Sequence, residues 1–320
     1  MSSSTRSRPR LRALGVLLAL VPAGPTTVPL PGVTVLPVAD RQVSLVVDIA
    51  GGTRPLPPEA VSVDVAGTRQ PAMFVPVMSD QLAASVVVDV SQAGGAGLAS
   101  WLSGAARFVL DAPAGARTAV VADTTPPAVL ARSPDGPVDI VRALSGVQPH
   151  GARDTSDALA LAVRELAATP AAPRVVILYT GAADAGDVAS GDLAARLARE
   201  HVLLVVVSTA AATRYWTDAT RPTGGFLAPA GAATVPAFDQ VATTLRDRYL
   251  VTFPAPAQLP ARASVRVDLP QVAMATDVVI PAADAPPDRG SGGGWLTVAV
   301  WVAVLVAAAL LLIGSALRLR

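Results

Sequence analysis

The chain of 320 residues carries 25 basic and 24 acidic residues, a formal net charge of +1, and 52% of its residues are hydrophobic. It has no cysteine, which excludes disulfide bridges and lipid anchoring at a cysteine, and it has no lysine, which excludes phosphate-binding glycine loops that depend on one. The near-neutral charge and the scattered arginines leave no basic stripe for a nucleic-acid partner.

The N-terminus has the parts of a secretory signal peptide. Four arginines precede an apolar stretch at 13–21, and the small residues around Ala23 match a cleavage site. We therefore predict a signal peptide over residues 1–23, with an uncleaved membrane anchor as the alternative. Residues 24–40 are punctuated by proline and are predicted to form an extended linker out of the signal.

Short β-rich segments occupy residues 41–80 and return at 249–280. The alternation of VSVDV at 61–65 indicates a strand with one buried and one solvated face. No helix is predicted within 249–280, so these strands cannot extend a parallel sheet by crossover connections. We expect them to pair with the 41–80 segments in one small antiparallel β domain.

Residues 82–248 alternate apolar strands with helices. Strands that are apolar on both faces indicate a parallel sheet covered by helices on both sides, an α/β fold. The polar ends of three such strands would meet at one edge of the sheet, where ligands of α/β proteins bind. These ends are Ser91, Gly181 and Ser208, and the helices are predicted at 97–110, 138–144, 155–168, 192–200 and 235–248.

The order of these elements resembles the von Willebrand factor A (VWA) family. DVSQA at 89–93 follows the first buried strand as the family's Asp-x-Ser-x-Ser motif does, and GARDTSDAL at 151–159 resembles its Gly-Gly-Thr loop. RVVILYTG at 174–181 resembles its strand that ends in Thr-Asp-Gly, and LRDRYLVTFPAP at 245–256 resembles the exit of bacterial secreted members. The resemblance implies a Rossmann-like, doubly wound, mostly parallel sheet.

The family binds Mg²⁺ or Mn²⁺ in a metal-ion-dependent adhesion site, where hydroxyl and carboxylate oxygens surround the ion and a partner's carboxylate completes the shell. Hard cations suit such oxygen ligands. The resemblance implies that this site is degenerate here, because alanine, arginine and threonine stand at three ligand positions. The corresponding residues are Asp89, Ser91, Ala93, Arg153, Thr155 and Thr180. We expect no cofactor, and Mg²⁺ or Mn²⁺ only as a weak alternative.

Two hypotheses concern the missing ion, and each has an alternative. Arg153 can substitute for it by pairing with Asp89 through charge-assisted hydrogen bonds, or it can simply face solvent. Asp184 and Asp187, which follow the second buried strand, can act as replacement ligands or belong to an ordinary polar loop.

Catalytic chemistry is not expected. A Ser–His–Asp hydrolase would need Ser91, Asp89 and His150 within hydrogen-bond reach, and the chain has no Gly-x-Ser-x-Gly elbow. The other histidine, His201, follows a helix and is predicted to be a turn or helix-end residue. We therefore predict that the protein is not an enzyme.

Tyr215 and Trp216 follow the third buried strand in a chain with few aromatic residues. Aromatic side chains beside arginines are typical of protein contact sites, and these two are candidate partner-binding residues with Asp89, Ser91 and Arg153. The alternative is that Tyr215 and Trp216 close the core under the final helix.

Residues 295–317 form an uncharged apolar run long enough to cross a bilayer as a helix. A flexible linker at 281–294 precedes the run, and the short tail at 318–320 carries arginines that favour the cytoplasmic side. We predict a single-pass membrane protein whose bulk lies outside the cytoplasm.

The expected function is that of a membrane-anchored, extracytoplasmic module which binds a protein partner of unknown identity through a degenerate, metal-free adhesion site. The alternative is a structural or assembly subunit that works beside an ATPase of the MoxR type. In that case its contacts would lie on a helical flank or on the membrane helix.

Overall fold

The computed structural model describes residues 27–49, 56–132, 136–167, 173–211, 214–230, 235–270 and 272–282. The predicted signal peptide, membrane span and C-terminal tail lie outside these ranges. No helix within the described residues combines the length and apolar character that a membrane crossing requires.

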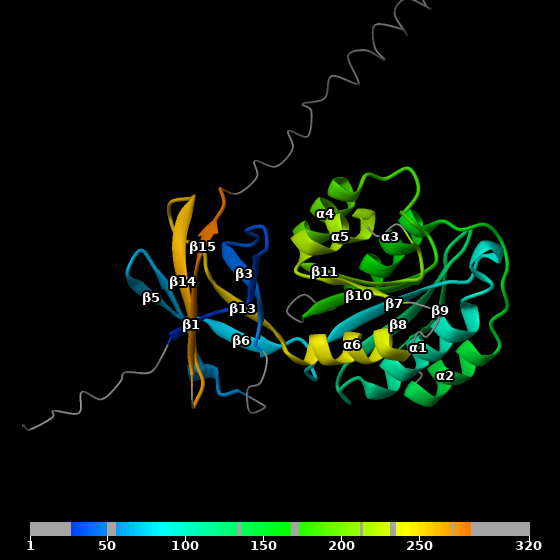
Figure 1. Cartoon of the computed structure of the whole chain (residues 1–320), viewed down its shortest axis with the longest axis horizontal. Coiled ribbons are helices and arrows are strands. Elements are labelled where there is room, and N and C mark those ends of the chain that lie inside the picture. Colours follow the sequence, from blue (N-terminus) through cyan, green and yellow to red (C-terminus); the bar gives the residue numbers. More distant parts are fainter. Residues whose placement is uncertain are drawn as a thin grey trace, which may run out of the picture.

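An α/β domain forms one end of the molecule and contains a six-stranded sheet (Figure 1). Five strands run parallel, and the edge strand β9 runs antiparallel to its neighbour β8. In sheet order the strands are β12 (Phe226–Pro229), β11 (Val202–Ser208), β10 (Arg174–Thr180), β7 (Ala83–Asp89), β8 (Arg117–Asp123) and β9 (Ala128–Arg132). The predicted mostly parallel sheet is confirmed.

Helices cover both faces of this sheet (Figure 1). One apolar core joins the sheet to α1 (Leu98–Asp111), α2 (Pro137–Ser145) and α6 (Val235–Arg246). A second core joins its other face to α3 (Thr155–Leu166), α4 (Ser190–Arg199) and α5 (Arg214–Thr220). Burial on both faces explains why the central strands are almost wholly apolar. Short 3-10 turns lie at Pro58–Ala60, Gln92–Gly94 and Arg221–Thr223.

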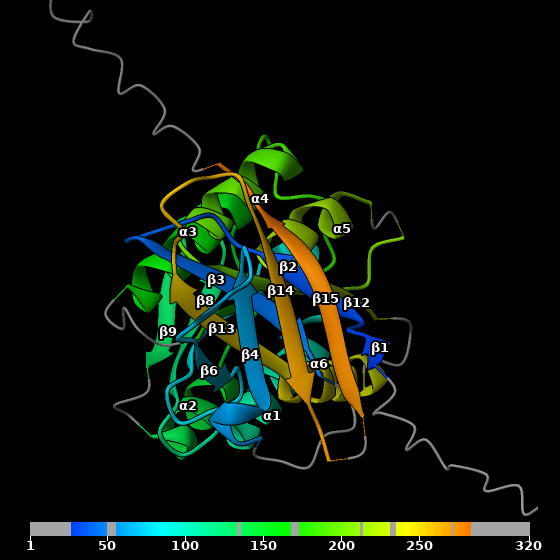
Figure 2. The same cartoon turned by 90° about the vertical axis from the view of Figure 1, so that its left-hand side faces the viewer.

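A β-sandwich forms the other end of the molecule. Its four-stranded sheet faces the α/β domain, and its five-stranded sheet lies outermost (Figures 1 and 2). The inner sheet contains β2 (Gly32–Val35), β3 (Gln42–Asp48), β13 (Arg248–Pro254) and β6 (Met73–Pro76). The outer sheet contains β1 (Thr27–Pro29), β15 (Ala273–Ile280), β14 (Ala261–Asp268), β4 (Val61–Val65) and β5 (Thr68–Gln70).

The two flanks of the chain build this sandwich together. β13 lies between β3 and β6, and β14 pairs with β4, all antiparallel. The expected pairing between 249–280 and 41–80 is therefore confirmed, although β1 and β15 pair in parallel. The two sheets enclose one apolar core of their own.

The prediction of a linker over residues 24–40 is wrong for its described part. β1 and β2 lie within this range, and each forms an edge of its sheet. Proline lacks an N–H but tolerates extended backbone, so a proline-punctuated segment can still supply edge strands.

Arg248 joins the sandwich to the α/β domain at the start of β13. Its Nε and Nη2 donate to the two carboxylate oxygens of Asp48 on β3, at 2.6 and 2.9 Å, and its Nη1 donates to the carbonyl oxygen of Gly224 at 2.5 Å. Its guanidinium also lies 5.1 Å from the ring centroid of Phe226 on β12. Because Arg248 is only 6% exposed, water cannot replace these contacts.

We expect Arg248→Ala to lower the free energy of unfolding by about 2–4 kcal/mol, since it leaves a partly buried carboxylate and a carbonyl without their donor. Arg266→Ala is the matched control. It removes an exposed pair with Asp268 and is expected to cost less than about 1 kcal/mol. Urea unfolding followed by circular dichroism would measure both, and equal losses would contradict the role given to Arg248.

Candidate functional site

The carboxyl ends of β7, β8 and β10 bring three polar side chains to one edge of the six-stranded sheet. Asp89 ends β7 and pairs directly with Asp123 at the end of β8, while Thr180 ends the neighbouring strand β10. The side chains of all three are fully buried. We call the loops that follow these strands, together with the loop that precedes α3, the loop edge.

Asp89 holds the centre of the loop edge. Its Oδ1 accepts hydrogen bonds from the backbone N–H of Ser91 at 3.1 Å and from the Ser91 hydroxyl at 2.5 Å. Its Oδ2 accepts from Arg153 Nε at 2.7 Å, and Arg153 Nη2 lies 2.5 Å from the same oxygen. The hydroxyl of Thr180 approaches Oδ2 at 3.5 Å.

The predicted pairing of Arg153 with Asp89 is therefore confirmed, and the solvent-facing alternative is wrong. The Arg153 side chain is 26% exposed and Asp89 is 0% exposed, so the guanidinium reaches from the surface onto a fully buried carboxylate. A charged acceptor and a charged donor strengthen such hydrogen bonds.

Asp123 is a second buried carboxylate, which the sequence reasoning missed. Its oxygens accept the hydroxyl of Thr155 at 2.5 Å and the backbone N–H of Asp154 at 2.8 Å. Burial raises the pKa of Asp123 from 3.8 to about 6, although these hydrogen bonds oppose the shift. The strand endings VVVD and VVAD follow the same pattern, and this similarity could have identified Asp123.

Thr155 thus contacts Asp123 rather than Asp89. It begins α3, and the preceding Asp154 caps this helix by accepting the backbone N–H of Asp157 at 3.2 Å. Backbone hydrogen bonds tie the loop before α3 to the end of β7, from His150 N–H to Val90 and from Gln92 N–H to Gly151.

At two other degenerate positions, Ala93 offers Asp89 no side-chain donor and Thr180 offers only the long hydrogen bond at 3.5 Å. Ala93 lies exposed in the turn before α1. The Thr180 hydroxyl accepts the backbone N–H of Ala182 at 2.9 Å, so it closes its own loop. Gly94 packs directly against Asp89, since a methyl group on Gly94 would lie 2.4 Å from the Asp89 carboxylate.

The structure contradicts the candidate role of Trp216 in partner binding. Trp216 is fully buried in α5, where its indole N–H donates to the carbonyl oxygen of Ala182 at 2.8 Å. Tyr215 is partly buried and its hydroxyl donates to the carbonyl oxygen of Val188 at 2.7 Å. The two residues close the core, as the alternative proposed, but beside α3 and α4 rather than under the final helix.

Asp184 and Asp187 lie on the rim of a cavity of about 480 Å³ between the loop before α3 and the loop after β10. Asp184 accepts the backbone N–H of Gly186 at 3.0 Å, which is the behaviour of a polar loop residue. Within the described residues, no three acidic, histidine or cysteine side chains gather closely enough to hold a metal ion.

The rings of both histidines contact backbone carbonyl oxygens. The ring of His150 contacts the carbonyl oxygen of Gln148 at 2.9 Å, whereas the Ser91 hydroxyl donates to Asp89 and accepts the N–H of Gly94. His201 has a left-handed backbone directly after α4, as expected of a helix-end residue.

Comparison with solved structures finds VWA-domain proteins. BatB from Bacteroides thetaiotaomicron has 10% identity and a TM-score of 0.46, over 51% of this chain and 96% of that one. A von Willebrand factor type A protein from Catenulispora acidiphila has 11% identity and a TM-score of 0.44, over 79% of this chain and 70% of that one. Proximal thread matrix protein 1 from the mussel byssus, with a zinc-occupied adhesion motif, has 18% identity and a TM-score of 0.46. The match covers 56% of this chain and 49% of that one.

All three TM-scores are below 0.5. No family model matches the chain. No curated protein matches it either.

Asp123 predicts a specific pH dependence. Because its pKa is about 6 in the folded chain and 3.8 in the reference state, the folded state binds the extra proton between these values, and stability falls as the pH rises through this window. Asp123→Asn cannot titrate. Its amide oxygen can still accept the N–H of Asp154, and its amide N–H can donate to the hydroxyl oxygen of Thr155. Relative to this variant, the parent chain should lose about 1–3 kcal/mol between pH 4 and pH 7.

Urea unfolding of both proteins across this range gives the difference directly. Asp187→Asn, an exposed substitution of the same kind, is the control. A parent-minus-variant difference that does not change with pH would contradict the burial of a titrating Asp123.

The close contact of Gly94 with Asp89 predicts that Gly94→Ala destabilises the chain by about 1–3 kcal/mol through overpacking. Gly191→Ala is the matched control, because nothing lies within 4 Å of the added methyl group and the site is in α4. It should be neutral or mildly stabilising. Thermal unfolding compares the two, and an unchanged midpoint for Gly94→Ala would be inconsistent with this packing.

Proposed function

We propose that the protein is a membrane-anchored, extracytoplasmic module that binds a protein partner at its loop edge without a metal ion. One observation carries this proposal. The loop edge is held together by a charge pair that belongs to the chain itself, Arg153 with Asp89, where a metal-binding relative would hold an ion.

The oxygen atoms around Asp89 do not suit a divalent ion unless Arg153 moves. One oxygen of Asp89 is engaged by Ser91 and the other by a cationic guanidinium, which would repel a second cation. Ala93 supplies no oxygen, and Thr155 is committed to Asp123. A hard ion would gain too few ligands to offset the loss of its water shell.

The position of the loop edge supports a binding role. The first and last described residues, Thr27 and Ala282, both belong to the sandwich end of the chain, which adjoins the starts of the parallel strands. The loop edge follows the ends of these strands and therefore faces away from the sandwich (Figure 1). A chain anchored beyond 282 would present this edge outward.

The second candidate function is that of an assembly subunit which uses its helical flank. A groove of about 470 Å³, lined mainly by residues of apolar type, lies between the end of α1 and the start of α2. Leu110 and Val138, on these two helices, are 57% and 65% exposed. Large exposed apolar side chains beside a groove favour a protein contact at this flank.

A photo-crosslinking amino acid placed at single positions separates the two functions. At Asp187 it probes the loop edge, at Val138 the flank, and at Arg262 the exposed face of β14 as the matched control. In native membranes we expect a discrete adduct from position 187 and none from 262. An adduct from 138 alone would replace the proposed function with the assembly role.

A further inference from the structure

The helix α1 begins at the loop edge without a side-chain cap. Its N-cap residue is Gly97, and no side chain accepts a hydrogen bond from the first turn. Within the described residues, the backbone N–H groups of Ala99 and Ser100 have no acceptor, whereas the backbone N–H of Trp101 donates to the carbonyl oxygen of Gly97 at 3.0 Å. The first turn also contains no acidic residue. The positive end of the helix dipole is therefore not offset by a side chain of this turn.

The indole N–H of Trp101 is a buried donor at the same place. Trp101 is 2% exposed, and within the described part of the chain its Nε1 has no hydrogen-bond partner. A methyl group on Gly97 would lie 2.6 Å from Cε2, the ring atom that is bonded to Nε1. The indole N–H therefore lies against the uncapped end of α1. Buried donors without an acceptor are rare in folded proteins, and this one is consistent with an acceptor from outside the chain.

The Trp101 ring lies between the turn before α1 and the loop after β10. A methyl group on Gly181 would lie 3.4 Å from both Trp101 Cη2 and the hydroxyl oxygen of Thr209. Both loops carry glycine where they contact the ring, which permits this close approach. Residues 94–97 are Gly-Gly-Ala-Gly, so no side chain larger than a methyl group holds the turn in place. A shift of this turn would expose the indole N–H to a ligand.

The charges around this turn favour an anion. Residues 90–106 contain no charged side chain. Asp89 directly precedes them, but it is fully buried and its charge is offset by Arg153. Free N–H groups and the helix dipole together favour negative charge at a helix N-terminus, and a glycine-rich turn lets a ligand approach the backbone.

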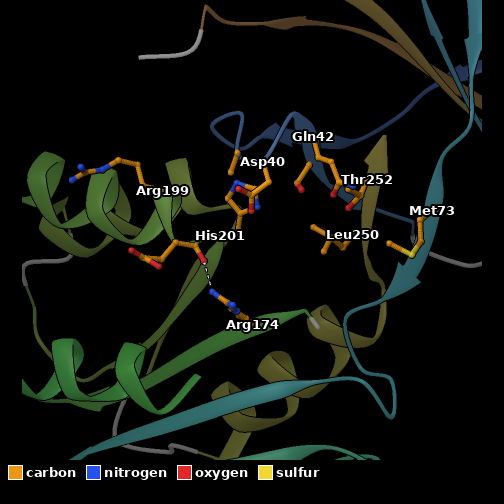
Figure 3. A pocket seen from close by; sticks show the side chains of 11 residues that line it. Asp40, Gln42, Met73, Arg174, Arg199, His201, Leu250 and Thr252 are labelled. Atoms are coloured by element: carbon orange, nitrogen blue, oxygen red, sulfur yellow. Dashed lines mark hydrogen bonds between the residues drawn. The ribbon is translucent and has the colours of Figure 1, made fainter. Parts of the chain in front are cut away.

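The polar cleft between the sandwich and the α/β domain, about 370 Å³ in volume, differs in this respect (Figure 3). There, Nη1 of Arg174 donates to the carbonyl oxygen of Glu200 at 3.2 Å (Figure 3). The ring of His201 lies 2.8 Å from the carbonyl oxygen of Pro37. Because these side chains have acceptors within the chain, the unpaired donors at α1 are the stronger indication of a ligand.

We propose that the N-terminus of α1 binds a phosphate or sulfate group. Two of its oxygens accept the backbone N–H groups of Ala99 and Ser100, and a third accepts the indole N–H of Trp101. A tetrahedral oxyanion has enough oxygens for three donors that come from different directions, whereas a carboxylate has only two. The charge of the anion strengthens each of these hydrogen bonds. This site takes a small oxyanion and does not depend on the protein partner proposed for the loop edge.

The indole ¹⁵N–¹H resonance of Trp101 in the full chain tests this proposal. We expect it to shift saturably when sodium phosphate or sodium sulfate replaces sodium chloride at constant ionic strength, with a midpoint on the order of 1 mM. The resonance of Trp216 is the internal control, because its indole N–H already donates to the carbonyl oxygen of Ala182. An absent shift at Trp101, or an equal shift at Trp216, would overturn the proposal.

Two substitutions one helical turn apart separate the helix N-terminus from a general effect of charge. Ala99→Asp places a carboxylate in the first turn, where it repels the anion, and should weaken phosphate binding about 10-fold or more. Ser103→Asp adds the same charge at an exposed position one turn later and should change the affinity less than about 3-fold. Calorimetry measures both affinities, and equal weakening would contradict a site at the helix end.

Trp101→Phe removes the indole N–H and keeps an aromatic ring in the core. It should weaken phosphate binding about 10-fold, and unchanged affinity in a variant that circular dichroism shows to be folded would exclude the indole donor. Methyl phosphate identifies the source of the group. Binding as tight as that of inorganic phosphate supports a phosphate group on a larger molecule, and binding about 10-fold weaker supports the free anion. The crosslinking result at position 187 does not depend on any of these outcomes.

Discussion

A carboxylate removed from water must be neutralised by its neighbours, and the loop edge is organised around that requirement at Asp89. Its two oxygens receive donors from the turn that follows β7 and from the loop that precedes α3. Arg153 contributes the only positive charge in these contacts, and it comes from a position 64 residues away in the sequence. Without that charge, a buried anion would destabilise the edge, and the loops would lose their common anchor.

Asp123, the neighbouring buried carboxylate, is subject to the same requirement. Asp123 lies in register with Asp89 on the next strand, and two adjacent buried carboxylates cannot both be ionised without cost. Burial raises the pKa of Asp123 and the charge of Asp89 adds a smaller part, while the hydrogen bonds of Asp123 fix Asp154 and Thr155 and thereby the start of α3. Arg153 directly precedes this pair of residues, so Asp123 also helps to direct the guanidinium onto Asp89.

The alternation of apolar strands and helices was sufficient to predict the α/β sheet, and the absence of helices after 249 predicted the pairing of the two β-rich flanks. The pairing of Arg153 with Asp89 followed from the resemblance, because arginine replaced a ligand beside a retained aspartate.

Other features depend on tertiary contacts. Proline-rich sequence concealed β1 and β2 because edge strands need few N–H donors. The ending of its strand hinted at Asp123, but the register that places it beside Asp89 is a tertiary feature. Trp216 was misjudged because α5 turns it inward.

We propose that Arg153 takes the place of a divalent ion at Asp89. Calorimetric titration with Mn²⁺ tests it most directly, in the parent chain and in a variant that restores the family's ligands by Ala93→Ser, Arg153→Thr and Thr180→Asp. We expect no saturable binding by the parent at millimolar Mn²⁺ and clear binding by the variant. Binding of Mn²⁺ by the parent as tight as that of the variant would contradict it.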